Sequence, residues 1–496
     1  MTVEPRYQLP YCKDLPTTPV PELGKVLVTG ATGYIGGRLV PELIERGYKV
    51  RVMVRSYSTE YPERWPGAEV IVADALNVDQ LRRALKDVSV AYYLIHSMLV
   101  ARKRFMPSEK LIVENFRRVA EEMKVRRIIY LGTQGIDGIE LKGRYKNRIK
   151  VGDQLRQGKV PVTILRTPVT VGSGSASFEI LHHIVRNYPV MFLPPWGKIQ
   201  CRPIGIRDLI KYLVGVLETP STAGGIFNIG GEDLLSYRDM IKILAKLLGK
   251  KRLLLPYPAS NIRFYSYILS LSTPVPAQIS SYILRGMSTA IDYNETSIQK
   301  HLDFKPVRFN VALQRALSQE EHDTIATRWS DAYPPAHELS IKLTELSAPP
   351  KFTSTYSIMT DKGASDIFRS ICQIGGHKGW FKTNWMWRLR GLIDRIFLGV
   401  GTSRGRRSDN TLRINDVIDF WRVEDMIDDQ RLLLRAEMIL PGKAWLEFLI
   451  EAHSEQNEIT VIAHFHTKSL LGRLYWYSFV PFHYFIFKDL LKQLSS

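Results

Sequence analysis

From Lys25 onward, short runs of apolar residues alternate with longer amphipathic stretches. Between the runs, apolar residues recur at spacings of three and four, as in Leu39-Val40-Leu43-Ile44 and Leu111-Ile112-Asn115-Phe116-Val119. A strand that is apolar throughout is buried on both faces, so this alternation predicts a parallel sheet covered by helices on both sides. The expected fold class is α/β with a doubly wound parallel sheet. The apolar runs expected as strands are 26–28, 50–54, 70–73, 90–95, 128–131 and 162–165.

The pattern loosens between Val169 and Leu317, where we expect helices at 178–186 and 209–217 and a strand at 226–229. This part is typical of a small substrate-binding region that follows such a sheet. A polar stretch with two Pro-Pro pairs then predicts a linker between domains. The expected division is an N-terminal tail at 1–24, a first domain at 25–317, a linker at 318–350 and a second domain at 351–496.

The second domain has a different pattern. Four consecutive segments show β-type alternation, and a long helical segment follows at 474–494. Consecutive strands that end in a long helix predict an antiparallel α+β unit rather than a second doubly wound sheet. The expected strands are 416–423, 431–439, 444–451 and 458–465.

A glycine-spaced turn follows the first apolar run, in the order strand, turn, helix. We expect Gly30 to allow the tight turn, Gly33 to let a pyrophosphate approach the backbone, and Gly36 to let helix and strand pack closely. The free N–H groups at the start of the helix would hold the phosphates. This pattern predicts a dinucleotide site of the Rossmann type. Its expected cofactor-binding residues are Gly30, Thr32, Gly33, Tyr34, Ile35 and Gly36.

The end of the second expected strand bears on the choice between NAD and NADP. An acidic residue there would bind the ribose 2′-hydroxyl, but this strand ends in Arg55. A guanidinium binds a 2′-phosphate well, and no carboxylate is present for a bare ribose. The sequence therefore favours NADP(H) over NAD(H). The alternative for Arg55 is a solvated strand end.

Further segments follow the expected strands in order: Asp74-Ala75, Leu94-Ile95-His96-Ser97, Arg166-Thr167-Pro168 and 227–231. With the glycine turn, they make residues 25–235 resemble the atypical and extended short-chain dehydrogenase/reductases, close to the NmrA-like and complex-I-accessory-like branches. The resemblance implies that Asp74 and Ala75 contact the adenine. It implies that Leu94, Ile95 and His96 lie beneath the ribose and that Pro168 passes the nicotinamide.

In the active enzymes that the chain resembles, a Tyr and a Lys four residues later act together. If Asp153 takes the place of the acidic residue that usually lies four beyond the lysine, Tyr145 falls on the tyrosine position, and the resemblance implies that Thr133 replaces the usual serine. Ile149 then stands where the lysine is expected, so half of the pair is missing. Lys146 and Lys150 would substitute only if the helix shifted, because they lie on another face. A surface tyrosine on a basic helix is the alternative for Tyr145.

Charge and composition narrow the classes of partner. Of the 496 residues, 68 are Lys or Arg and 49 are Asp or Glu, giving a formal net charge of +19. Such a balance favours anionic partners. No zinc-finger, helix-turn-helix or RNP-type motif is present, which argues against nucleic acid. The basic, aromatic segment 380–390 predicts either an amphipathic helix lining a cavity or peripheral contact with an anionic membrane.

Cysteine and histidine usage argues against a metal centre. The three cysteines, Cys12, Cys201 and Cys372, are far apart, which is typical of a reducing compartment. His464, His466 and His483 lack a convincing zinc spacing, so no metal ligand is expected. Met1–Leu23 lacks the apolar core of a signal peptide. We therefore expect a cytoplasmic location, with peripheral attachment to the inner membrane as the alternative.

Three segments of the second domain, 417–423, 432–438 and 474–477, resemble an uncharacterised bacterial domain of helix-grip, START-like type. That resemblance implies a curved sheet around a long helix, with an apolar cavity for a hydrophobic ligand. We expect aromatic side chains on the inner face of the sheet or on the helices that cover it: Trp385, Trp387, Trp421 and Trp476.

Three functions remain open at this stage. The first is an NADP(H)-dependent oxidoreductase or epimerase that acts on a small hydrophobic molecule, isoprenoid or quinone-like. The second is a catalytically silent NADPH-binding sensor or assembly factor, which Ile149 favours. The third is a lipid or quinone carrier. The sequence identifies neither the substrate nor the oligomeric state.

Overall fold

The computed structural model describes residues 10–55, 57–58, 60–95, 106–133, 151–258, 261–287, 298–321, 325–332, 342–376, 378–402, 406–454 and 456–496. The chain divides into two compact units. The first comprises Met1–Ser266 and Gln278–Ala332, and the second comprises Tyr267–Ala277 and Tyr333–Ser496.

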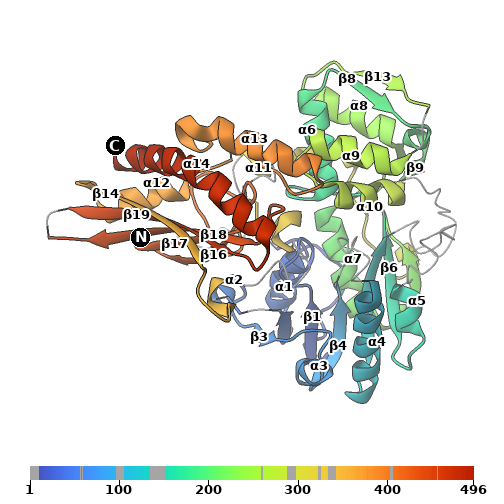
Figure 1. Ribbon diagram of the computed structural model, residues 1–496. Helices are drawn as coiled ribbons and strands as arrows, with labels where there is room; N and C mark the ends of the chain where they lie inside the picture. The colour runs from blue at the N-terminus through green and yellow to red at the C-terminus, as the bar shows by residue number, and fades with distance from the viewer. Residues whose placement is uncertain are drawn as a thin grey trace. The chain divides into compact units, whose positions relative to one another are not determined.

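A seven-stranded sheet forms the centre of the first unit (Figure 1). Its order is β11-β6-β5-β4-β1-β2-β3, and every pairing is parallel. The expected doubly wound α/β class is confirmed, because each predicted apolar run forms a strand. The strands are β1 (Lys25–Thr29), β2 (Val50–Val54), β3 (Glu69–Val72), β4 (Val88–Tyr93), β5 (Arg127–Thr133), β6 (Val162–Thr167) and β11 (Ile226–Asn228).

Helices cover both faces of this sheet, as the apolar strands require. Residues of α1 (Gly36–Glu45) and α7 (Ile206–Glu218) share one apolar cluster with the strands. On the other face, the cluster includes residues of α3 (Val78–Leu85), α4 (Met106–Glu122) and α5 (Val151–Arg156). The central strands β1, β2, β4, β5 and β6 are therefore buried on both sides, which explains their lack of polar alternation, whereas the edge strand β3 is half-buried or exposed. A short helix, α2, spans Tyr61–Arg64.

Residues 169–321 build a smaller part with its own apolar cluster. The predicted helices and the predicted strand are present, as α6, α7 and β11. Helix α6 spans Ala176–Asn187, and the further helices of this part are α8 (Tyr237–Leu247), α10 (Ala277–Met287) and α11 (Phe309–Glu321). Helix α9 (Ile262–Ser272) includes residues of both units. Its short strands are β7 (Thr170–Val171), β8 (Val190–Leu193), β9 (Gln200–Cys201), β10 (Ile204–Gly205), β12 (Leu235–Ser236) and β13 (Leu253–Pro256).

Two stretches expected to be peripheral pack on the first unit. Within the expected tail, Cys12 is buried, and Glu42 on α1 accepts hydrogen bonds from its N–H (2.9 Å) and from that of Tyr11 (2.6 Å). Within the expected linker, the Thr327 hydroxyl accepts a bond from Arg38 (2.6 Å) and donates to the Tyr34 carbonyl oxygen (2.9 Å). These bonds satisfy buried polar groups that polarity alone would assign to solvent.

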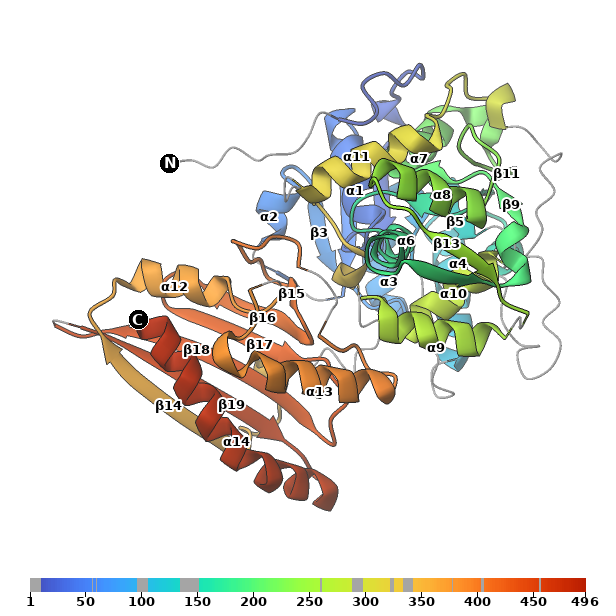
Figure 2. The ribbon, with the colours of Figure 1, turned by 90° about the horizontal axis from the view of Figure 1, so that it is seen from above.

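The second unit contains one antiparallel sheet in the order β14-β19-β18-β17-β16-β15. The antiparallel α+β prediction is confirmed, although the sequence did not predict the first strand. Its strands are β14 (Phe352–Thr360), β15 (Val417–Ile418), β16 (Trp421–Ile427), β17 (Arg431–Ala436), β18 (Lys443–Ala452) and β19 (Asn457–His466). Its helices are α12 (Ala364–Cys372), α13 (Asn384–Ile396) and α14 (Leu470–Ser495), which lie on the same face of the sheet (Figures 1 and 2).

Stacked aromatic rings fill the space between this sheet and its helices. Trp387 lies 4.3 Å from Trp380 and 6.2 Å from Trp421, measured between ring centroids. Trp476 stacks on Phe465 at 5.7 Å. Trp387, Trp421 and Trp476 are buried, as expected. Trp385 differs from the expectation, because Trp387 occupies the inward side of α13 and leaves the Trp385 side chain 63% exposed.

No helix within the described ranges is both long enough and apolar enough to cross a membrane.

His483 on α14 lies in an apolar environment in the second unit. Its ring lies 5.1 Å from Trp476 and 5.3 Å from Phe487, and burial lowers its pKa to about 4. The pKa in the unfolded chain is about 6.5. The depressed pKa means that this contribution to stability is complete above pH 6.5 and falls as the pH drops toward 4.

We predict that His483→Phe loses less thermal stability than the wild type when the pH falls from 7 to 4. The substitution removes a group that must charge in an apolar environment. Thermal melts of both proteins across this range measure the effect, with His453→Phe as an exposed control. Parallel loss of stability in wild type and His483→Phe would show that His483 does not carry the acid sensitivity.

Candidate functional site

The turn between β1 and α1 approaches the end of β4 very closely. Gly30 has φ of +65°, which side chains rarely adopt. A Cβ atom there would lie 2.5 Å from the carbonyl oxygen of Leu94. The Thr29 hydroxyl donates to the Tyr92 carbonyl oxygen (2.9 Å) and accepts from the Leu94 N–H (3.1 Å). The turn is therefore held against the carboxyl edge of β4, where parallel sheets bind ligands.

The start of α1 leaves backbone donors available. The Gly33 N–H donates to the Gly30 carbonyl oxygen at 3.0 Å. Among the residues with described positions, no backbone acceptor bonds the N–H groups of Thr32, Tyr34 or Ile35. These donors, with the positive end of the helix dipole, form an anion-binding concavity. A dinucleotide pyrophosphate fits this donor set.

Gly36 is required by packing. A Cβ atom on it would lie 2.4 Å from the Gly30 carbonyl oxygen and 2.9 Å from the Ala31 Cα. These neighbours are backbone atoms, so they cannot move aside without shifting the turn or the helix. Any side chain at Gly36 would therefore move the backbone donors that Thr32 and Ile35 provide.

Tyr34 contributes its backbone N–H to the expected phosphate site, whereas its phenol does not face that site. Its hydroxyl is buried, and burial raises the pKa of Tyr34 to about 12. A Cβ atom on Gly172 would lie 2.6 Å from this oxygen, so the side chain points into the protein. Arg38 covers the ring, with its guanidinium carbon 4.2 Å from the centroid. The side chain anchors the turn and leaves the N–H for a ligand.

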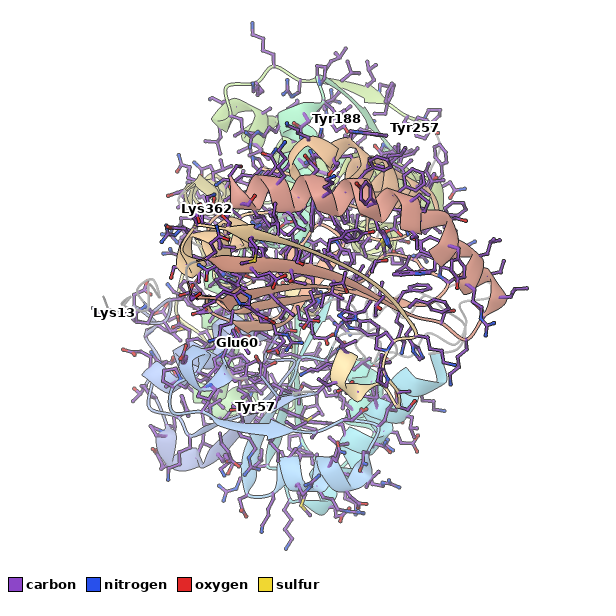
Figure 3. All side chains as sticks on the ribbon, turned by 60° about the vertical axis from the view of Figure 1, so that its left-hand side comes forward. Lys13, Tyr57, Glu60, Tyr188, Tyr257 and Lys362 are labelled. Atoms are coloured by element: carbon purple, nitrogen blue, oxygen red, sulfur yellow. The ribbon has the colours of Figure 1, made fainter. Side chains whose placement is uncertain are left out.

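Arg55 is exposed immediately after β2. It lies in the same loop region as Tyr57 and Glu60, which Figure 3 labels. Burial raises the pKa of the nearby Tyr61 to about 12, while the charges of Arg64 and Arg55 lower it by smaller amounts. The Arg55 side chain is thus accessible at the end of the second strand, next to an aromatic group.

Asp74 and Ala75 follow β3 in an ordered loop. The Asp74 carboxylate accepts the Leu76 N–H at 2.9 Å, and the Asp74 N–H donates to Gln80 at 2.7 Å. The buried Asn115 amide donates to the Ala75 and Leu76 carbonyl oxygens at 3.4 and 3.3 Å. Asn115 is a polar residue within the apolar stripe of α4, and no role was expected for it from the sequence.

The carboxyl edge of β5 brings together two hydroxyl groups. The Thr133 hydroxyl lies 2.8 Å from the phenol oxygen of Tyr282 on α10, and either group can donate. No sequence signal pointed to Tyr282, which is 149 positions away. Pro168 is buried just beyond β6, and Thr167 is the register partner of Thr133. Tyr145, Ile149 and His96 lie outside the described residues, whereas Leu94 is buried and Ile95 half-buried beside the turn.

The histidines of the second unit have other partners. His464 bonds Glu447 at 2.8 Å, and this bond lowers the pKa of the Glu447 carboxyl. Within the described ranges, one group has metal-compatible spacing, namely Glu451, His453 and Glu458. Glu451 and His453 are exposed, and the His453 ring lies 3.4 Å from Glu458. This group is a largely exposed contact between a histidine and a glutamate, with a second glutamate nearby.

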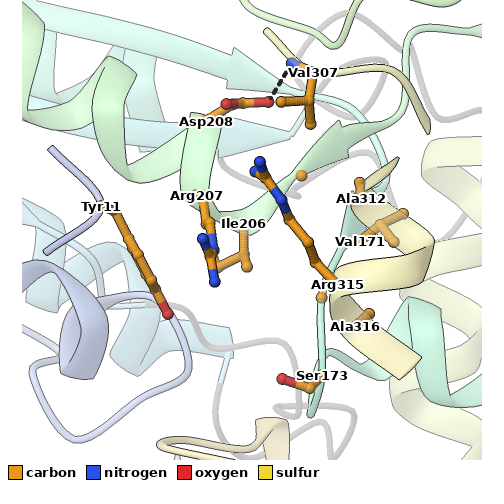
Figure 4. A pocket seen from close by; sticks show the side chains of 12 residues that line it. Tyr11, Val171, Ser173, Ile206, Arg207, Asp208, Val307, Ala312, Arg315 and Ala316 are labelled. Carbon is orange, nitrogen blue, oxygen red and sulfur yellow. Dashed lines mark hydrogen bonds between the residues drawn. The ribbon is translucent and has the colours of Figure 1, made fainter. Parts of the chain in front are cut away.

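A shallow pocket lies elsewhere in the first unit, between the starts of α7 and α11 (Figure 4). Arg207 covers the ring of Tyr11, with its guanidinium carbon 5.2 Å from the centroid. The buried Asp208 carboxylate accepts the Val307 N–H at 2.9 Å. Burial raises the pKa of Asp208. None of the predicted site residues lines this pocket.

Comparison with protein families assigns the two ends of the chain separately. Residues 30–176 match a family described as NAD(P)H-binding. The matched range includes the glycine turn, Arg55, Asp74 and Thr133. Residues 347–490 match a family described as "Protein of unknown function (DUF2867)". Residues 30–176 are therefore similar to NAD(P)H-binding domains, and this match supports the predicted NAD(P)H-type cofactor.

The chain is also similar to curated proteins of two kinds. It is 22% identical over 249 residues to the chloroplastic divinyl chlorophyllide a 8-vinyl-reductase of Cucumis sativus, covering 47% of this chain and 58% of that protein. It is 18% identical over 248 residues to the photosystem II assembly factor Ycf39 of Trieres chinensis, covering 49% and 75%. The match thus spans little more than half of the plant reductase.

Among solved structures, the chain is similar to the Citrobacter sp. triphenylmethane reductase complexed with NADP(H). The TM-score is 0.48 with 18% sequence identity, and the match covers 59% of this chain and 99% of that one.

We predict that Gly36→Ala weakens NADP(H) binding at least about tenfold, because its Cβ would displace the turn. Alanine favours helices over glycine by about 1 kcal/mol, so helix propensity alone acts in the opposite direction. Calorimetric titration of the folded variant measures the affinity. Gly363→Ala in the second unit is the control, since its Cβ would meet one atom at 4.0 Å. If Gly36→Ala binds NADP(H) with the affinity of the wild type, this turn is not part of the binding site.

Proposed function

We propose that the protein is an NADP(H)-dependent oxidoreductase that acts on a small hydrophobic molecule. The observation that carries the proposal is the contact between Thr133 and Tyr282 at 2.8 Å, at the carboxyl edge of the NAD(P)-binding sheet. Two hydroxyls at this edge form a polar group next to the expected nicotinamide position. A bound nicotinamide cofactor would supply the hydride.

Arg55 supports the preference for NADP(H). A guanidinium offers several donors in a fixed plane and matches phosphate oxygens bidentately. Its exposure at the end of β2 leaves it accessible to a 2′-phosphate. The backbone donors at the start of α1 would hold the pyrophosphate, and the loop of Asp74 and Ala75 would border the adenine.

Thr133 and Tyr282 would handle the proton. As a hydride reaches the carbonyl carbon of the substrate, the carbonyl oxygen would gain electron density and take a proton from the Tyr282 phenol. Thr133 would orient this phenol, and solvent would return the proton to the phenolate. This role does not need a lysine at position 149. Tyr145 remains the competing proton donor, on the basis of family resemblance.

The idea of a hydrophobic ligand rests on the topology of the second unit, by resemblance of fold alone. Its first strand, β14, pairs with its last, β19, and the long α14 packs with both. This order is typical of the helix-grip fold, which we propose for residues 351–496. The contacts among Trp380, Trp387 and Trp421 favour a packed core at these rings rather than a lipid-carrier site.

A catalytically silent NADPH-binding sensor or assembly factor is the second candidate. Ile149 at the family's lysine position favours it. The two functions differ in one observable property, because a sensor binds NADPH without consuming it.

We predict that NADPH binds at least about tenfold more tightly than NADH, since Arg55 pairs with the 2′-phosphate. Arg55→Asp should narrow or reverse this preference, whereas Arg83→Asp on α3 should leave it unchanged. Calorimetric titration of each protein with both cofactors measures the ratio. Equal affinities in the wild type, or an unchanged ratio in Arg55→Asp, would contradict the assignment.

We predict that Tyr282→Phe lowers NADPH-dependent turnover at least about a hundredfold while changing cofactor affinity little. Thr133→Val should lower it too, and the double variant should lose no more than the worse single variant. The assay follows NADPH oxidation with quinone and isoprenoid carbonyl compounds. Tyr188→Phe, an exposed phenol elsewhere, is the control. Undiminished turnover in Tyr282→Phe together with loss in Tyr145→Phe would transfer the role to Tyr145. Absence of turnover with every compound, despite NADPH binding, would favour the sensor.

A further inference from the structure

Helix α13 has an apolar stripe on its outer side, where surface helices are normally polar. The stripe residues recur at spacings of three and four, so they share one face. The opposite side of the helix packs inward through Trp387, Gly391 and Asp394. The exposed fractions of these side chains are those in the whole chain, so in the second unit alone the stripe is at least as exposed. The exposed stripe residues are Trp385, Leu389, Leu392, Ile393 and Ile396.

Helix α14 repeats the arrangement. Trp476, Phe487 and Leu490 pack toward the sheet, whereas the opposite side is apolar and exposed. A helix that is apolar all round normally has a partner on each side. Within the described part of the chain, the Tyr477 ring contacts Phe352 of β14, with ring centroids 6.0 Å apart, and most of this outer side is nevertheless exposed. Its exposed residues are Leu470, Leu471, Leu474, Tyr477, Phe482 and Phe485.

The two stripes face the same way. Helices α13 and α14 lie on one face of the sheet in both views, so their outer sides point away from it together (Figures 1 and 2). Their inward sides belong to one apolar cluster. The stripes therefore form a single outward surface, which we call the α13/α14 face.

The charges around the α13/α14 face have one sign. The exposed charged side chains of 381–398 and 468–496 are all Lys or Arg, including Lys382, Arg388, Arg473 and Lys488. The acids of these segments are turned inward, since Asp394 is buried and Asp489 accepts the Thr383 N–H at 3.2 Å. Like charges disfavour contact with a second copy of this chain. Basic side chains around an apolar face favour a partner that is apolar inside and negatively charged at its boundary.

We propose that the α13/α14 face docks on an anionic lipid bilayer. The apolar stripes would enter the boundary between headgroups and acyl chains, and the cations would lie among the phosphates. Exposed Trp385 and Tyr477 suit this depth, because an amphipathic ring prefers the interface. The attachment is independent of cofactor binding and of turnover, so the proposal stands apart from the proposed oxidoreductase function.

Vesicle flotation of the full chain tests the proposal, using phosphatidylcholine vesicles with and without phosphatidylglycerol. The wild type should float with the anionic vesicles and bind them less at high salt. Each cation near an anionic surface contributes roughly fivefold to binding. The Arg388→Glu/Arg473→Glu variant should therefore bind at least about tenfold less. The Leu389→Glu/Leu474→Glu variant should also bind at least about tenfold less, because it places charges in the apolar stripes. Leu253→Glu, exposed on β13, is the matched control and should bind as the wild type does.

Tryptophan fluorescence gives a second measurement. Anionic vesicles should shift the wild-type emission to the blue, and Trp385→Phe should lose most of that shift. Circular dichroism and thermal melts check that each variant folds, as outward side chains should permit. Wild-type protein that does not bind anionic vesicles, or double variants that bind as well as wild type, would overturn the proposal. So would a concentration-dependent dimer that the Leu389→Glu/Leu474→Glu substitutions abolish without lipid.

Discussion

The close approach of the β1–α1 turn to the end of β4 is the constraint on which the cofactor site depends. With φ of +65° and no Cβ, Gly30 lies directly against the Leu94 carbonyl group. Thr29 bonds the backbone of β4 on both sides of that contact. This places the start of α1, with its backbone donors, at the carboxyl edge of the sheet. The positions of the β5 edge and of the loop after β3 follow from the same parallel sheet.

The sequence predicted the first unit well because its strands are apolar throughout and its glycines have fixed geometric roles. Near-continuous runs such as 50–54 and 128–131 have few structural alternatives. The prediction was poorer for segments whose burial depends on distant partners. Residues 325–332 belong to a stretch that was expected to be a polar linker, yet Thr327 packs on α1 through bonds to Arg38 and Tyr34. Strand β14 was missed because its inward positions include Ser354, so its alternation is weak.

The residues of the candidate site likewise fall into those that local motifs predict and those that depend on distant partners. The residues predicted for the cofactor site follow successive strands of the sheet, and local motifs predicted each of them. The contact between Thr133 and Tyr282 joins positions 149 residues apart, and it depends on how α10 packs beside the sheet. No spacing rule encodes such a contact. Trp385 illustrates the reverse case, because helical periodicity assigns it to a stripe without indicating whether the stripe faces the core or the exterior.

A crystal structure of the full chain with NADP(H) tests the account most directly. The pyrophosphate oxygens should lie about 3 Å from the N–H groups of Thr32, Tyr34 or Ile35. The 2′-phosphate should contact the Arg55 guanidinium, and the nicotinamide should lie at the β5 edge within reach of Thr133 and Tyr282. A cofactor bound away from the glycine turn, or a nicotinamide far from both hydroxyls, would contradict the account.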